Sequence, residues 1–443
     1  MERQQDYVLR TVEERGVRFV QLWFTDVLGI PKHFDITPAE LEDALEEGMT
    51  FDGSAIDGFS RVQESDMLAK PDPKTFQLLP RSDDAPVARM FCDINNLDGT
   101  PFEGDPRHVL RRALEKGRQK GFSFFVAPEM EFFYLGSSDP RKPLEPLDSG
   151  SYFDLMAADL TSDLRKRTIL TLEEMGIPVE YSQHEDAPSQ HEIDLRYTDA
   201  LTMADNVITF RLLVKEIAIS RGVHASFMPK PFSDQQGSGM HTHVSLFEGD
   251  TNAFYDPTDE YGLSQVAKGF IAGVLAHSRE ITAVTNQWVN SYKRLVKGYE
   301  APVYVSWARN NRSALIRVPV VKKGHPESTR IEYRAPDPAC NPYLTYALLL
   351  TAGLRGIEGG YDLPPEAAAN LYQLSTEELL AEKIEALPGS LSEAVAEMER
   401  SELAADTLGE HVFHWFVRNK REEWAGYKTQ VSQWELDRYL GTL

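Results

Sequence analysis

The sequence has few cysteines, no long apolar run and a shortage of positive charge, and each absence excludes a class of protein. The two cysteines, Cys92 and Cys340, lie far apart without a CxxC partner, which argues against a disulfide framework or a structural zinc site. The longest apolar stretch, Tyr343 to Leu354, is shorter than the roughly 20 residues that span a bilayer, and it is typical of a buried helix. The formal net charge of -23 disfavours nucleic acid or an anionic membrane as partner.

What remains is the composition of an ordinary globular protein. With 42% apolar and 26% charged residues, the chain can bury a large core, and its 443 residues predict two or three domains. The first residues lack the apolar segment of a secretory signal, so we expect a cytoplasmic protein. No internal repeat or low-complexity tract interrupts the chain.

The pattern of elements changes near Gly104-Asp105-Pro106, where turn residues precede a long helical pattern. Residues 1–104 predict a small α+β domain, with helices at 3–15 and 37–48 and strands at 17–24, 75–79 and 87–94. Residues 105–443 predict a larger α+β domain. In it, short strands at 123–127, 131–135, 179–182, 192–196, 223–227 and 241–246 are separated by helices, and residues 365–443 are mostly helical.

Several predicted strands carry carboxylates in an unusual pattern. Glu129 and Glu131 are two residues apart, so in a strand they point the same way and repel each other unless a positive group lies beside them. The following Phe132-Phe133-Tyr134 makes a solvated strand face less fitting. Glutamate also follows histidine at 184–185 and at 191–192.

Histidines and arginines complete the pattern. His241 and His243 share one face of a predicted strand, and Arg330, Glu332 and Arg334 share a face of another. Many carboxylates with few imidazoles suit Mg²⁺ or Mn²⁺ better than zinc, and Mg²⁺ suggests phosphate chemistry. In so acidic a chain, a positive cluster near these groups predicts an anion site. Its members are Lys293, Arg294, Arg309, Arg312, Arg317, Arg330 and Arg334.

At these residues the sequence resembles the bacterial type I glutamine synthetase family, over essentially the whole chain. The resemblance rests on nine segments in family order: Phe51-Asp-Gly-Ser-Ala-Ile-Asp-Gly-Phe59, Pro128-Glu-Met-Glu-Phe132, His184-Glu-Asp-Ala-Pro-Ser-Gln-His-Glu192, Phe227-Met-Pro-Lys-Pro231, Gly237-Ser-Gly-Met-His-Thr-His243, Asn290-Ser-Tyr-Lys-Arg-Leu295, Gly298-Tyr-Glu-Ala-Pro302, Asn311-Arg-Ser-Ala314 and Arg330-Ile-Glu-Tyr-Arg-Ala-Pro-Asp337. Their joint occurrence is far more specific than any one of them.

The resemblance implies two metal ions and a set of substrate contacts. Glu131, Glu185 and Glu192 match the ligands of the metal nearer glutamate, while Glu129, His241 and Glu332 match those of the metal that bridges the ATP phosphates. Arg294, Arg312 and Arg334 would hold the glutamate carboxylates and the transferred phosphoryl group, next to the Gly237 loop. His243, Arg317 and Arg330 would contact nucleotide phosphates, and Tyr197 and Ser245 would line the adenine site.

The remaining matched residues concern the amine. Asp52 matches the acid that takes a proton from ammonium, Tyr152 an aromatic of the amine pocket, and Glu300 the flap. The chemistry implied is ATP-dependent activation of L-glutamate as γ-glutamyl phosphate, followed by attack of ammonia to give glutamine, ADP and phosphate.

The resemblance also implies the fold and assembly. Residues 1–104 would form a β-grasp domain that supplies the Asp52 loop to a neighbouring active site. Residues 105–443 would form a catalytic domain with a curved antiparallel sheet surrounded by helices. Subunits would form a dodecamer of two hexameric rings. Arg61 matches an arginine that relays glutamine inhibition in the feedback-controlled subgroup, and Tyr372 matches a tyrosine that is nucleotidylated in longer relatives.

Four positions depart from the family pattern and leave the amine open. Ala55 replaces a second serine beside the Asp52 loop, and Asp186, directly after a predicted metal ligand, replaces a small apolar residue. Gln236 replaces an Asn or Pro before the Gly237 loop, and Lys297 replaces a Pro of the flap. They are either neutral differences or signs of a larger amine, such as a polyamine or ethanolamine, as in the actinobacterial γ-glutamyl-amine ligases that the sequence also resembles. A non-catalytic relative would have lost metal ligands, and a metallohydrolase would need an HExxH-type zinc site. The sequence fits neither.

Overall fold

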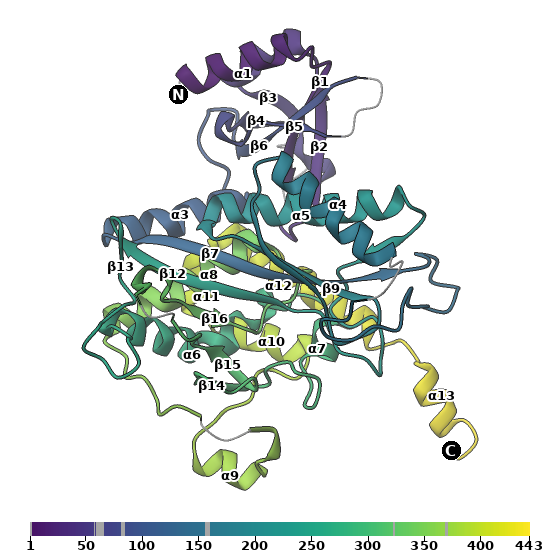
Figure 1. The fold of residues 1–443 in the computed structure, drawn as a ribbon, viewed down its shortest axis with the longest axis vertical. Coiled ribbons are helices and arrows are strands. Elements are labelled where there is room, and N and C mark those ends of the chain that lie inside the picture. The colour runs from purple at the N-terminus through teal and green to yellow at the C-terminus, as the bar shows by residue number, and fades with distance from the viewer. Residues whose placement is uncertain are drawn as a thin grey trace.

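In the computed structural model the protein is an α+β fold with two sheets, one above the other in Figure 1. The structure describes residues 2–56, 58, 66–80, 85–155, 160–321, 324–367 and 371–443. Both cysteines are buried and free. None of the helices in these ranges combines the length and apolarity needed to cross a membrane.

The N-terminal sheet has six strands in the order β2-β1-β6-β4-β3, with β5 added beside β6. β1 and β6 run parallel, and the other pairs are antiparallel. The alternating apolar residues of β1, including Val20 and Leu22, are fully buried, which fixes the face that forms the core. The elements are α1 Glu2–Glu14, β1 Phe19–Thr25, β2 Pro31–Ile36, η1 Pro38–Glu40, α2 Leu41–Glu46, β3 Met49–Asp52, η2 Gly53–Ala55, β4 Asp66–Pro71, η4 Pro73–Thr75, β5 Gln77–Leu79 and β6 Val87–Asn95.

The second sheet has ten strands and carries the predicted site residues. Its order is β14-β15-β16-β12-β7-β9-β8, with β10 and β11 beside β7 and β13 beside β12. All pairs are antiparallel except β14 with β15. Its strands are β7 Ser123–Leu135, β8 Val179–His184, β9 Gln190–Leu195, β10 Thr198–Asp199, β11 His224–Ser226, β12 Met240–Glu248, β13 Thr251–Asn252, β14 Tyr304–Ala308, β15 Ala314–Arg317 and β16 Ile331–Tyr333.

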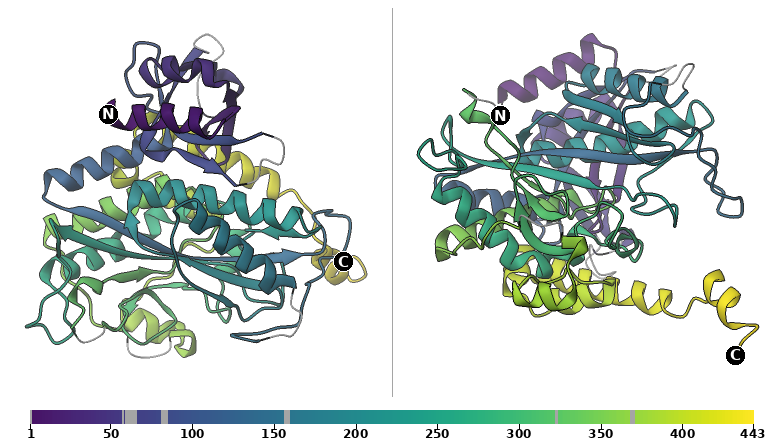
Figure 2. Two further views of the ribbon diagram at one scale, coloured as in Figure 1. Left: turned by 45° about the horizontal axis from the view of Figure 1, so that its top comes forward. Right: turned by 60° about the horizontal axis from the view of Figure 1, so that its bottom comes forward.

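Helices pack against this sheet, as Figures 1 and 2 show. α8 is the apolar stretch recognised in the sequence. It begins at Pro342 behind the N-cap Asn341, is buried along most of its length, and ends before the left-handed Gly360. The helices are α3 Pro106–Gln119, α4 Leu160–Glu174, α5 Ala200–Ile219, α6 Gln265–Thr285, α7 Ser291–Arg294, η5 Pro326–Ser328, α8 Pro342–Gly359, η6 Leu371–Gln373, α9 Thr376–Ala381, α10 Leu391–Met398, α11 Glu402–Leu408, α12 Glu410–Tyr427 and α13 Gln433–Tyr439. α13 projects from the body near the C-terminus (Figure 1).

A buried arginine connects the N-terminal sheet to the helices of the larger, ten-stranded part. The guanidinium of Arg107, at the start of α3, donates to Asp93 and to Asp72 (3.0 Å) on the N-terminal side, and to Asp205 of α5 (3.0 Å) on the other. Removing one partner of such a buried, multiply paired charge is costly, so the junction holds the two parts in one arrangement.

Two features of the strands differ from the prediction. Residues 123–127 and 131–135 belong to one continuous strand, β7, which runs through Pro128. The predicted break there was wrong because the ladder to β12 continues past the proline, with Pro128 opposite Thr242. β2, β3, β4, β14 and β15 were not predicted, since each is only four to six residues long.

Candidate active site

The strand register brings the predicted metal ligands together. Glu129 on β7 lies opposite His241 on β12, and Glu131 lies opposite Glu192 on β9. Glu332 on β16 lies opposite His243, and Glu185 follows directly after β8. The six predicted ligands all line one cavity of about 540 Å³.

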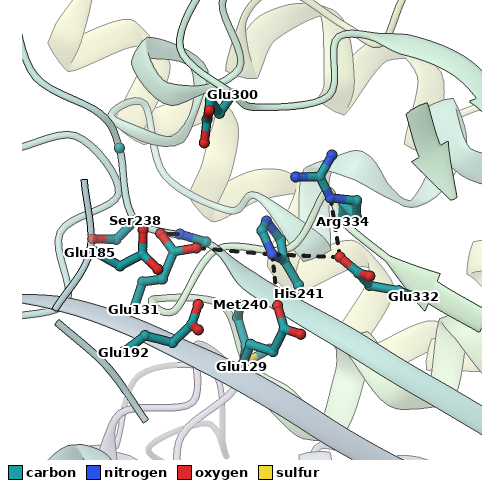
Figure 3. Close-up of polar contacts among 12 residues, drawn as sticks. Glu129, Glu131, Glu185, Glu192, Ser238, Met240, His241, Glu300, Glu332 and Arg334 are labelled. Carbon is teal, nitrogen blue, oxygen red and sulfur yellow. Dashed lines mark hydrogen bonds and ion pairs between the residues drawn. The ribbon is translucent and has the colours of Figure 1, made fainter. Parts of the chain in front are cut away.

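His241 lies in the middle of this group, as Figure 3 shows. Its Nδ1 atom is 3.1 Å from Glu129 Oε2, 3.8 Å from Glu332 Oε1 and 4.0 Å from Glu131 Oε1. His243 also reaches Glu129, with Nε2 2.7 Å from Oε1. One atom each of Glu129, His243 and Glu332 lie within 4.8 Å of one another. The structure therefore gathers both histidines of β12 around Glu129.

The other three glutamates lie on the far side of His241 in Figure 3. The backbone N–H of Gly239 and the side-chain amide of Gln190 donate to Glu131, at 2.8 and 3.2 Å. The amide of Gln183 donates to both Glu185 (2.7 Å) and Glu192 (2.8 Å). These donors orient the carboxylates without neutralising them.

Burial and mutual repulsion act on the protonation of these groups. Burial, together with the neighbouring Glu185, raises the pKa of Glu131 to about 8. Burial raises the pKa of Glu185 to about 7, and burial with the nearby Asp194 raises that of Glu192. Burial also acts on Glu129, but His243 and His241 outweigh it and lower its pKa. A nest of buried carboxylates that ionises with difficulty by itself gains most from a bound cation.

The donor set fits hard divalent cations. The five predicted glutamate ligands and one imidazole line the cavity together with Asp194 and Glu300, and oxygen-rich sites with few histidines suit Mg²⁺ or Mn²⁺. The structure brings the six predicted ligands to one cavity, and their binding of metal stays a prediction.

Most of the predicted arginines line the same cavity. Arg317 pairs with Glu332, whose Oε1 also lies 3.2 Å from Arg334 Nε. Arg294 is buried and donates to the carbonyls of Ala335 (2.7 Å) and Arg334 (3.1 Å). Arg309 and Arg312 complete the set. Lys293 does not belong to it, because its amine donates to the hydroxyl of Tyr427 (2.9 Å) and it lines neither this cavity nor the second one described below.

The predicted flap residue stands over the mouth of this cavity. Glu300 has a left-handed backbone with φ of 53°, an uncommon conformation for a residue with a side chain. The hydroxyl of Tyr152 donates to Glu300 Oε2 (3.0 Å), and Arg312 Nη1 is 3.9 Å from Oε1. The carbonyl of Ala301, which follows Glu300 in the chain, accepts a hydrogen bond from the hydroxyl of Tyr372 (2.5 Å). The flap is thus held from two sides.

Gly237 lines the cavity where a side chain has no room. A Cβ there would lie 2.7 Å from the carbonyl oxygen of Pro229 and 2.8 Å from Cγ of Arg294. The neighbouring Gln236 also lines the cavity. Glycine at 237 therefore lets the backbone pack closely against the side chain of Arg294.

A second cavity of about 630 Å³ opens on the other side of Glu129. It is lined by Tyr197, His243, Ser245 and Arg330, the residues predicted at the nucleotide. Phe125 and Phe247, in edge contact at 5.0 Å between ring centroids, add an apolar wall. Arg317 is the exception, because it lines the first cavity and not this one.

The predicted proton acceptor lies elsewhere. Asp52, at the end of β3, accepts hydrogen bonds from the backbone N–H (2.9 Å) and hydroxyl (2.7 Å) of Ser54, and it is exposed. These two bonds lower its pKa. Asp52 lines neither cavity of its own chain, and Ala55 is likewise exposed. Arg61 lies outside the described residues.

The sequence reading missed three polar residues of the site. Gln183 and Gln190 orient the carboxylates, and Asp194 lines both cavities with Oδ1 buried and without a hydrogen-bond partner in the described part of the chain. Burial, with Glu129 next to it, raises the pKa of Asp194 to about 9. Asp194 is two residues from the predicted ligand Glu192 in β9, so alternation alone would have found it. Gln183 lies near the end of β8 and Glu185 just beyond it, so alternation does not identify Gln183.

A nest of carboxylates and arginines beside a cavity with an apolar wall suits chemistry with ATP and divalent cations, and the comparisons with known proteins place the chain among the ATP-dependent ligases. The family model described as "Glutamine synthetase, beta-Grasp domain" matches residues 16–97, and "Glutamine synthetase, catalytic domain" matches residues 103–439. The chain therefore belongs to the glutamine synthetase family.

The similarity to known proteins extends over nearly the whole chain. The chain is 59% identical to the glutamine synthetase of Mycolicibacterium smegmatis over 99% of this chain and 100% of that one. It is 49% identical to the glutamine synthetase of Thermotoga maritima over 98% of both. Among solved structures, one described as a GmaS/ADP complex has a TM-score of 0.89 at 33% identity, covering 98% of this chain and 99% of that one. The glutamine synthetase of Plasmodium falciparum has a TM-score of 0.88 at 25% identity, covering 99% and 98%. The relatives' names do not favour the larger-amine alternative.

Proposed function

We propose that the protein forms glutamine from L-glutamate and ammonia, with ATP converted to ADP and phosphate through γ-glutamyl phosphate. The observation that carries this proposal is the convergence of all six predicted metal ligands on one cavity that also contains Arg294, Arg312 and Arg334. The relatives at 49% and 59% identity bear the name of this activity.

Each part of the cavity has a place in the reaction. Glutamate lies with its α-carboxylate toward Arg294 and Gly237, and its side-chain carboxylate faces the second cavity, where ATP binds. Arg334 and Arg312 attract the phosphoryl group as it passes between them. His243 and Arg330 hold the remaining phosphates, and Tyr197 and Ser245 lie where the base binds.

The carboxylates would hold two divalent cations, Mg²⁺ or Mn²⁺. Glu131, Glu185 and Glu192 would hold one, and Glu129, His241 and Glu332 would hold the other, since all six line the first cavity. When bound, the cations neutralise the charge of the nucleotide phosphates and of the transferred group. A bound cation would offset the burial and the neighbouring Glu185 that raise the pKa of Glu131, and the burial that raises the pKa of Glu185.

The flap keeps water from the acyl phosphate while the amine enters. Tyr152 and Glu300 form one wall of the amine pocket, and Glu185 forms another. The anionic wall attracts ammonium, and the reactive intermediate is protected when Glu300 closes over it.

Ammonium becomes a nucleophile only after it loses a proton, and we assign that proton to Asp52 of a neighbouring subunit. Asp52 is exposed and lies outside its own chain's cavities, while the low pKa set by Ser54 keeps it ionised. Residues 1–104 would then complete the site of an adjacent subunit in a dodecamer of two hexameric rings. The cytoplasmic location and the feedback role of Arg61 remain predictions from the sequence.

An amine panel tests the function directly. Purified protein with L-glutamate, ATP and Mg²⁺ is supplied with ammonium, methylamine, ethanolamine or spermine, and phosphate and amide products are measured. We expect ammonium at millimolar concentration to give the fastest amide formation. Turnover with ethanolamine or spermine and none with ammonium would overturn the proposal.

A further inference from the structure

A second cluster of acid and histidine lies behind the metal ligands. Asp148, His184 and His191 place one ligand-type atom each within 4.8 Å of one another, and all three side chains are at most 4% exposed. His184 and His191 directly precede Glu185 and Glu192 and face each other across β8 and β9, with ring centroids 4.7 Å apart. Nothing in the proposed reaction uses them.

The hydrogen bonds do not suit a metal. The guanidinium of Arg165 lies 2.6 Å from Nδ1 of His191, and because a guanidinium only donates, Nδ1 must accept. The hydrogen of the neutral ring is then on Nε2, the atom that faces Asp148 at 3.8 Å, so no lone pair is left there for a cation. A guanidinium at this distance also repels a dication.

The contacts of His184 instead place it between the end of β8 and a loop. Its Nδ1 faces the carbonyl oxygen of Glu185 (2.7 Å), and its Nε2 faces Oδ1 of Asp148 (3.1 Å). The side chains of His184 and Asp148 are both buried, so the ring is held on two sides. One side of this buried pair holds the carbonyl of a residue that is a proposed metal ligand.

The other side holds a loop. Asp148 belongs to residues 146–155, the Tyr152 loop, and its carboxylate also accepts from the backbone N–H of Gly150 (3.1 Å) and Ser189 (2.7 Å) and from the hydroxyl of Thr161 (3.2 Å). Gly150 is packed so tightly on His184 that a Cβ would lie 2.5 Å from Nε2. Further along the loop, Phe153 donates its N–H to the carbonyl of His184 (3.2 Å).

We propose that Asp148 and His184 are positioning residues for amide formation, which fix the Tyr152 loop to the end of β8 and so align the flap contact with the ligand Glu185. Tyr152 bonds Glu300 from this loop, and Glu185 continues from the same strand. A loop that shifts by about 1 Å would open the amine pocket to water and misplace the amine, while glutamate and ATP still bind from other elements. This inference rests on the proposed function.

The test is Asp148→Asn, which keeps an oxygen for the N–H groups of Ser189 and Gly150 but removes the charge opposite His184. The assembled enzyme is assayed for amide formed per phosphate released, for the KM of amine and of ATP, and for bound Mn²⁺ per subunit. We expect the coupling ratio to fall to about half or less and the KM for amine to rise at least about fivefold, with the KM for ATP and the Mn²⁺ count unchanged. Asp139→Asn, which removes an exposed Asp–Arg pair upstream of the loop, is the matched control and should leave all four values unchanged.

Other outcomes overturn the inference. A variant that loses thermal stability or kcat while its coupling ratio and amine KM stay those of the wild type shows a merely structural role. A lower Mn²⁺ count shows a metal site instead. If Asp148→Asn does not assemble, Thr161→Val removes one bond to the same carboxylate and should lower the coupling ratio less, and an unchanged ratio there contradicts the proposal. Coupling is measured with whichever amine supports turnover, so a wrong amine in the proposed function does not affect this test.

Discussion

Glu129 and His241 lie directly opposite each other across β7 and β12, and Nδ1 of His241 is 3.1 Å from Oε2 of Glu129. The same imidazole is within 4.0 Å of Glu131 and Glu332. One residue therefore touches both groups of carboxylates, because the ladder between two long antiparallel strands fixes the register. The proposed metal binding depends on this alignment.

The ligand groups are separable by substitution. Glu332→Gln keeps the shape of the side chain but removes a charge next to Arg317 and Arg334, whereas Glu131→Gln removes one on the glutamate side. We expect both to lower kcat at least about 100-fold, with Glu332→Gln raising the KM for ATP more than that for glutamate. Steady-state kinetics over a range of Mg²⁺ concentrations measures this. Equal effects of both variants on both substrates would contradict the assignment.

The flap should govern coupling. In Glu300→Ala the contacts to Tyr152 and Arg312 are lost, and water gains access to the acyl phosphate. We expect phosphate release without amine to rise relative to amide formation, while the KM for ATP is unchanged. Product analysis by chromatography measures the ratio. A variant as tightly coupled as the wild type would show that Glu300 does not exclude water.

Sharing of the active site between subunits predicts complementation. In each proposed site, one subunit supplies Asp52 and its neighbour supplies Arg334. An assembly made only of Asp52→Ala subunits, or only of Arg334→Ala subunits, should therefore be nearly inactive. Co-expressed at equal levels, they should recover roughly a quarter of wild-type activity, because about a quarter of the sites then receive both intact residues. Assays of the purified mixed assembly measure this. Activity no higher than that of the single variants would place Asp52 in its own subunit's site.

Ala55 tests the choice of amine. Ala55→Ser restores the hydroxyl that the family pattern has beside the Asp52 loop, and it reduces the space there. If this position selects the amine, the KM for ammonium falls several-fold while that for methylamine rises. Unchanged values for both amines would mean that the alanine is a neutral difference. Asp98→Asn, at a loop tip of the same domain, serves as a control.

Asp105 predicts a pH dependence of stability. It caps α3 through the N–H of Arg107 (2.9 Å) and is buried, and burial, with the nearby Asp93, raises its pKa to about 7. In the unfolded chain Asp105 loses its proton near the ordinary pKa of an aspartate, about 4. Between about pH 4 and 7 the folded state therefore binds more protons than the unfolded state. The contribution of Asp105 to the free energy of unfolding falls as pH rises through this range. Asp105→Asn retains a capping oxygen without the charge.

We therefore expect the stability of Asp105→Asn relative to the wild type to increase from about pH 4 to 7 and to stay level above that. Urea unfolding of both proteins at matched pH values measures the difference in the free energy of unfolding. A difference that does not change with pH, or that changes in the opposite direction, would show that Asp105 is ionised in the folded protein throughout this range.

The sequence was informative where alternation and side-chain chemistry coincide. Glu129, Glu131, His241 and Glu332 were predicted on strand faces, and the sheet brings them together because those faces point into one cavity. The continuity of β7 through Pro128 and the short strands β14 and β15 were not predictable, since tertiary pairing stabilises them more than local propensity does. The pairing of His184 with Asp148 depends on a contact between residues 36 positions apart, which no local pattern encodes.

We expect the carboxylate nest to hold two divalent cations per subunit, and a binding titration measures this number. Mn²⁺ is titrated into the metal-free enzyme and free ion is followed by electron paramagnetic resonance, for the wild type, Glu131→Gln and Glu332→Gln. The account predicts two ions per subunit in the wild type and the loss of a different one in each variant, with ADP strengthening only the ion that remains in Glu131→Gln. One ion or none in the wild type, or the same ion lost in both variants, would contradict it.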